Sequence, residues 1–71
     1  MTKKEIKALR YEIYELTDQL ADIEDDDEYN RLADHINGLI AQYHDARFER
    51  MLRRGEVSSR EEYNALYGKF R

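Results

Sequence analysis

Residues 6–23 read IKALRYEIYELTDQLADI, and this stretch decides the fold. Its apolar side chains recur at alternating intervals of three and four residues: Ile6, Leu9, Ile13, Leu16, Leu20 and Ile23. That spacing places all six on one face of an α-helix, as in a coiled coil. Thr2 and Glu5, three residues apart, form the sequence signature of a capping box at its start. We therefore predict a helix over residues 2–23.

A second stretch repeats the same spacing. Its members are Tyr29, Leu32, Ile36, Leu39, Tyr43 and Ala46, with Ile40 beside them. The pattern keeps its phase through Asn37-Gly38, which in isolation would signal a turn. We therefore predict one helix over residues 26–54; the alternative is a break at Gly38. We expect one of Asp25, Asp26 and Asp27 to cap its start and Gly55 to supply the left-handed conformation at its end.

The acidic run at 24–28 separates the two apolar stripes, so we predict a turn there and an antiparallel hairpin. In that hairpin every apolar position meets an apolar partner. The expected pairs are Ile23 with Tyr29, Leu20 with Leu32, Leu16 with Ile36, Ile13 with Leu39, Leu9 with Tyr43 and Ile6 with Ala46. Such agreement between local pattern and global pairing favours this fold. Leu16 and Ile36 are the expected centre of the core.

A short third helix is predicted over residues 59–70. Ser58 with Glu61, or Ser59 with Glu62, forms a second capping box, and the apolar face carries Tyr63, Leu66, Tyr67 and Phe70. We expect it to fold back on Phe48, Met51 and Leu52. The fold class is thus all-α, one domain over residues 1–71. One short helix covers little surface, so Tyr11, Tyr14 and Ile40 lead us to expect a homodimer.

The sequence contains no pattern of residues that is typical of an enzyme active site. The chain has no cysteine, no glycine-rich phosphate loop and no histidine paired with a carboxylate at helical spacing. We expect His35 and His44 on the surface or flanking the apolar stripe, and Ser58 and Ser59 as caps. We therefore predict no enzyme, no catalytic residue, no cofactor and no metal site. Without an apolar run of ~20 residues or a secretory leader, we expect a soluble, cytoplasmic protein that does not bind membranes.

Charge is distributed unevenly along a chain of net charge −4. In the predicted hairpin the turn end is acidic and the open end is basic. The basic pole comprises Lys3, Lys4, Lys7, Arg10, Arg47, Arg50, Arg53 and Arg54. Helix dipoles favour acids at helix starts and bases at helix ends. They do not explain lysines at the start of the first helix or Asp18 and Asp22 near its end, so this polarity indicates recognition surfaces.

The predicted function is protein–protein interaction. Six tyrosines are many for 71 residues, and exposed tyrosine pairs are typical of interfaces; the alternative is that the third helix covers them. The candidate interface comprises Tyr11, Tyr14, Asp22, Glu24, Asp25, Asp26, Asp27, Glu28, Tyr63 and Tyr67. We expect a small regulator, inhibitor or assembly factor, of the kind phages and mobile elements direct at a host protein. The alternative is a nucleic-acid regulator that binds phosphate through the basic pole, which the net negative charge disfavours.

Overall fold

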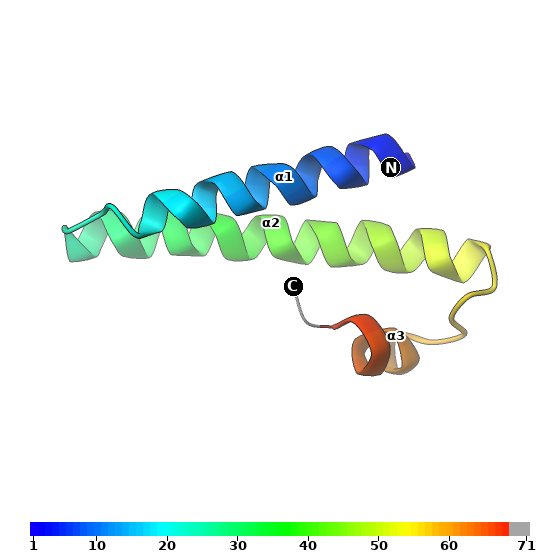
Figure 1. Ribbon diagram of the computed structural model, residues 1–71. Coiled ribbons are helices and arrows are strands. Elements are labelled where there is room, and N and C mark those ends of the chain that lie inside the picture. The colour runs from blue at the N-terminus through cyan, green and yellow to red at the C-terminus, as the bar shows by residue number, and fades with distance from the viewer. Residues whose placement is uncertain (69–71) are drawn as a thin grey trace.

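The computed structural model describes residues 1–68 and contains, over that range, three α-helices and no strand. They are α1 (Lys3–Leu20), α2 (Asp26–Arg53) and α3 (Arg60–Tyr67). Helices α1 and α2 run antiparallel as a hairpin, and α3 folds back beside the C-terminal half of α2 (Figure 1). The predicted all-helical hairpin with a short third helix is therefore confirmed. The molecule is elongated, with a longest dimension of 44 Å.

Helix α1 begins as predicted and ends early. The Glu5 N–H donates to Thr2 Oγ1 at 3.2 Å, and the Thr2 N–H donates to Glu5 Oε1 at 3.3 Å, which completes the capping box. The predicted helix extends to Ile23, but the structure ends α1 at Leu20. Beyond Leu20 the N–H groups of Ala21, Asp22 and Ile23 bond to carbonyls three residues back. An aspartate at the negative end of a helix dipole is unfavourable, which explains why the last turn tightens and stops there.

Helix α2 runs unbroken through Gly38, as the phase of its apolar stripe predicts. No atom lies within 4 Å of a side-chain carbon built at Gly38, so this glycine faces open space. Asp25 caps the helix by accepting the Asp27 N–H at 3.2 Å. At the other end Gly55 adopts φ 75°, and the N–H groups of Gly55 and Glu56 return to the carbonyls of Leu52 and Met51. These two bonds form a Schellman motif, so the predicted cap at Gly55 is confirmed.

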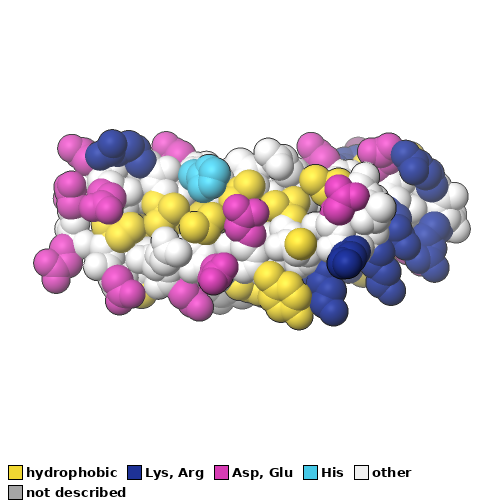
Figure 2. All heavy atoms as spheres, turned by 90° about the horizontal axis from the view of Figure 1, so that it is seen from above, with side chains coloured by type: hydrophobic (Ala, Val, Ile, Leu, Met, Phe, Trp, Pro, Cys, Tyr) yellow, Lys and Arg dark blue, Asp and Glu magenta, His cyan; other side chains and the backbone are white. Residues whose placement is uncertain are grey.

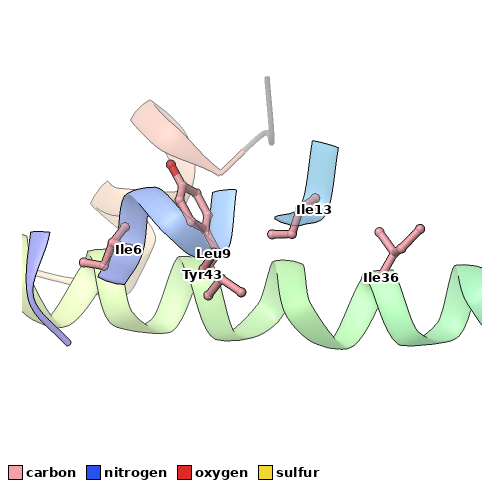
Figure 3. Close-up of a cluster of buried hydrophobic side chains, with 5 residues drawn as sticks. All are labelled: Ile6, Leu9, Ile13, Ile36 and Tyr43. Carbon is pink, nitrogen blue, oxygen red and sulfur yellow. The ribbon is translucent and has the colours of Figure 1, made fainter. Parts of the chain in front are cut away.

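The hairpin core lies nearer the open end than predicted. Its buried members are Ile6, Leu9, Ile13, Ile36 and Tyr43 (Figure 3). Ile36 is buried as expected, but Leu16 is only half-buried, and the fully buried Ile13 takes the central place. Tyr29 is 44% exposed, so its predicted place in the stripe is wrong. Because α1 stops at Leu20, no further turn of α1 is available to cover Tyr29.

Helix α3 is capped by Ser59, the second of the two predicted alternatives. Ser59 Oγ accepts the Glu62 N–H at 3.2 Å, while Ser58 Oγ donates to the Glu62 carboxylate at 2.9 Å. Tyr63 packs edge-on against Phe48, with ring centroids 5.7 Å apart, so the predicted contact with Phe48 is confirmed. Leu52, by contrast, remains 45% exposed. Phe70, the last residue of the predicted apolar face, lies outside the described residues.

Candidate functional site

The two ends of the molecule carry opposite charge. Figure 2 shows acidic side chains predominating at the turn end, where a basic side chain also lies, and lysine and arginine side chains predominating at the open end, where acidic side chains also lie. All six predicted acidic interface residues, at positions 22 and 24–28, are exposed. At the other end the start of α1 and the end of α2 lie side by side (Figure 1). The hairpin therefore brings together two basic segments that are more than 35 residues apart in the sequence.

Four cations of the basic pole line one groove between α1 and α2. Ile6 and Tyr43, both buried, contribute its apolar part, and the groove has a volume of about 340 Å³. Its cationic lining comprises Lys3, Lys7, Arg10 and Arg47. We call these six residues the basic groove. No carboxylate within residues 1–68 forms an ion pair with any of the four cations.

Tyrosine hydroxyls orient the two arginines of the basic groove. The Nε and Nη2 atoms of Arg10 donate to the Tyr14 hydroxyl at 3.2 and 3.1 Å. Arg47 Nη1 donates to the Tyr43 hydroxyl at 3.3 Å, and its Cζ lies 4.9 Å from the centroid of the Tyr67 ring. Donation to the Tyr14 hydroxyl raises the pKa of Arg10. Because a phenol is neutral, it fixes a guanidinium without cancelling its charge, and both arginines stay available to an anion.

A second hollow at the same end is partly neutralised. It has a volume of about 200 Å³, and its lining comprises Met1, Ala46, Glu49, Arg50, Arg53 and Arg54. Arg53 bonds to Glu49 at 2.7 Å, and Arg54 lies 3.6 Å from Glu56. Together the two hollows take in seven of the eight predicted basic-pole residues, and Lys4 lines neither. The four cations of the basic groove lack such partners, so their positive charge is less offset than in the second hollow.

Tyr63, predicted at an interface, is instead the anchor of α3. Its side chain is fully buried, and its hydroxyl lies 2.7 Å from Nδ1 of His44. Burial lowers the pKa of His44, helped by the positive charges of Arg60 and Arg47, and burial raises the pKa of Tyr63. Both groups are therefore neutral near pH 7, and the phenol O–H is placed to donate to the imidazole. Tyr63 drops out of the candidate interface.

The burial of His44 could have been predicted from a second apolar stripe on α2, which lies beside the main one. Ile40, His44, Phe48 and Met51 recur at intervals of four, four and three, which marks a second stripe on α2. The structure places α3 against this stripe, where His44 is buried next to Tyr43. The sequence predicted each histidine either on the surface or beside the main stripe. His44 lies beside the stripe, and His35 is exposed on the surface.

The burial of His44 predicts a pH-dependent stability. The folded-state pKa of His44 lies below its unfolded value of about 6.5, so the unfolded chain binds more protons in this range. The free energy of unfolding should therefore fall as the pH is lowered from about 7.5 to 5.5. Urea titrations followed by circular dichroism measure it. His44→Gln should flatten the dependence, while His35→Gln should leave it intact; an unchanged slope in the His44 variant would refute the assignment.

The remaining predicted tyrosines differ in exposure. Tyr11 is 61% exposed, with Lys7 Nζ 6.0 Å from its ring centroid. Tyr14 and Tyr67 are half-buried, and each stacks with a groove arginine. Tyr11 is thus the one predicted interface tyrosine with an open ring. The part of the chain that the structure describes contains no group of three histidine or acidic side chains arranged to hold a metal ion.

No family model, curated protein or solved structure matches this chain. None of the described helices combines the length and apolarity needed to cross a bilayer.

Proposed function

We propose that this chain is a non-enzymatic protein-interaction module whose basic groove receives an acidic segment of a partner protein. The observation that carries the proposal is the set of four groove cations, two of them oriented by tyrosine hydroxyls and none in an ion pair within residues 1–68. Several carboxylates in sequence match several fixed cations, which raises the association rate and sets specificity. The exposed lining of the groove is more apolar than polar, which adds apolar contact. Such a module acts in the cytoplasm as a regulator, inhibitor or assembly factor.

The net charge of −4 does not oppose anion binding at the basic groove. The acidic turn lies at the opposite end of a molecule 44 Å long. At physiological ionic strength the Debye length is about 8 Å, so an anion at the groove experiences mainly the nearby cations. The local charge, rather than the sum over the chain, governs what the groove attracts.

The same cations favour a second candidate function, nucleic-acid binding. Phosphates are anions too, and the open ring of Tyr11 beside Lys7 offers a surface on which an unpaired base can stack. Neutralising four phosphates of duplex DNA would give a slope of about −3.6 for log K against log salt concentration. The mainly apolar lining of the groove favours a peptide instead, because a phosphate backbone offers it no apolar contact.

Fluorescence anisotropy with labelled poly-glutamate and a labelled DNA duplex tests both candidates. We expect poly-glutamate to bind more tightly than DNA, with an affinity that falls as salt is raised. Replacing Lys7 and Arg10 by glutamine should weaken binding about fivefold or more, because two charge contacts are lost. Tighter binding of DNA would favour the second candidate.

The matched control replaces Lys4 and Arg31 by glutamine. It removes the same charge, one lysine and one arginine, outside both hollows. Its affinity for poly-glutamate should stay within about twofold of wild type, because neither side chain lines the groove. Equal losses in the control and the groove variant would contradict a specific groove, as would the absence of binding in wild type.

A further inference from the structure

We infer that the basic groove takes the acidic turn of a second copy of this chain, so that two copies pair antiparallel about a two-fold axis. The inference rests on the proposed function, in which the groove receives an acidic segment, and it names that segment. The two surfaces are complementary: four cations without ion pairs at one end, and five consecutive carboxylates at 24–28 at the other.

The acidic turn is suited to enter a groove. It lies at the tip of the hairpin, where α1 passes into α2, and acidic side chains crowd this end of the surface (Figures 1 and 2). Residues 24–28 are all exposed, and none of their carboxylates forms an ion pair within residues 1–68. The Asp25 cap fixes the backbone of the turn through the Asp27 N–H. The occupant is therefore an exposed, ordered segment of five acids with unneutralised charge.

The polarity of the molecule selects an antiparallel pair. A chain that is basic at one end and acidic at the other can join head to tail. Such an assembly always keeps one free basic end and one free acidic end, so it continues into a filament. Antiparallel pairing about a two-fold axis uses both ends of both copies and closes at two chains. Each dimer then contains the groove–turn contact twice. The two contacts lie at opposite ends of a 44 Å molecule, beyond the range in which like charges at these contacts repel strongly.

Exposed aromatic rings at the two ends support the same arrangement. Tyr29 follows the acidic turn and is 44% exposed, and Tyr11 neighbours the basic groove and is 61% exposed. Antiparallel pairing brings Tyr29 of one copy to the end that carries Tyr11 of the other. Burying these rings adds apolar area to a contact that is otherwise electrostatic. A partner with an acidic segment competes with the second copy for the groove.

Sedimentation equilibrium of the whole chain tests this pairing. Wild type should show twice the mass of one chain at high micromolar concentration in about 0.15 M salt, and dissociate as salt is raised. Lys7→Gln with Arg10→Gln should raise the dimer dissociation constant about tenfold or more, because each change acts at both contacts. Glu24→Gln with Glu28→Gln should do the same. The controls, Arg53→Gln with Arg54→Gln and Glu12→Gln with Glu15→Gln, remove the same number of charges outside the groove and the acidic turn and should dimerise like wild type.

The orientation has a separate readout that does not depend on folding of the charge variants. The chain lacks cysteine, so Lys4→Cys gives one spin-label site per copy. Antiparallel pairing predicts a label-to-label distance comparable to the 44 Å length, whereas parallel pairing predicts a short one. A short distance, a monomeric wild type or equal effects in controls and site variants would overturn the inference. A monomer that still binds poly-glutamate would overturn the pairing alone and leave the proposed function standing.

Discussion

Replacement of Ile13 by alanine is expected to lower the free energy of unfolding by about 2–5 kcal/mol. Ile13 is fully buried and belongs to the core cluster, whose members come from both helices of the hairpin (Figure 3). Truncating it removes apolar contacts and leaves a cavity that two rigid helices cannot close. A core in a chain of this length rarely supplies more than about 3–5 kcal/mol, so most molecules of the variant should be unfolded.

Thermal and urea denaturation followed by circular dichroism measure this loss. Leu16→Ala is the matched comparison, since Leu16 lies one turn further along the same stripe and is only half-buried. Leu16→Ala should lower the free energy of unfolding clearly less than Ile13→Ala does. Glu12→Ala, at an exposed neighbour of Ile13, should change stability little. A larger loss for Leu16 than for Ile13 would mean that the core is centred where the sequence pattern put it.

Replacement of Tyr63 by alanine is expected to cost about 3–5 kcal/mol and to release α3 from the hairpin. Tyr63 is fully buried, its ring packs against those of His44, Phe48 and Tyr67, and its hydroxyl bonds to His44. Val57 is the other buried residue of this C-terminal segment. The exposed ion pair between Arg60 and Asp45 contributes at most a little. Without the Tyr63 ring, few contacts of α3 remain to hold it.

Hydrogen exchange distinguishes this local release from global unfolding. Amides of α3 should lose protection in Tyr63→Ala, while amides near Ile13 and Ile36 keep more of theirs. Tyr63→Phe keeps the ring and removes only the hydroxyl, so the buried Nδ1 of His44 loses this partner at a cost of about 1–3 kcal/mol. Undiminished protection of α3 in Tyr63→Ala would contradict the anchoring role of this ring.

The features that sequence alone predicted are the local ones. The capping residues Thr2, Asp25 and Ser59 each act on an N–H two or three residues away, so their types and spacings suffice to locate helix starts. The continuity of α2 through Gly38 followed from the phase of its apolar stripe, because a helix keeps one face against its partner only while that phase holds. The antiparallel hairpin followed from two matched stripes and a short acidic turn between them.

Several features that the sequence did not predict depend on contacts between segments far apart in the chain. Tyr63 and Tyr67 lie on one predicted face, yet Tyr63 is completely buried and Tyr67 only half-buried. The difference depends on where along α2 each ring lies, which the sequence does not show. His44 is polar, and only a partner from a distant segment makes its burial favourable. The basic groove joins residues 3–10 to 43–47, so its cations could be grouped from the sequence, whereas the tyrosine hydroxyls that orient Arg10 and Arg47 could not.

The functional proposals meet at the basic groove, which would hold either a partner's acidic segment or the acidic turn of a second copy. Sedimentation velocity with labelled poly-glutamate added to the wild-type dimer examines whether one site serves both. We predict that the dimer dissociates as the peptide binds, and that the label sediments with a single chain. A label that sediments with an intact dimer would contradict a shared groove, as would a dimer that persists at peptide concentrations that saturate the chain.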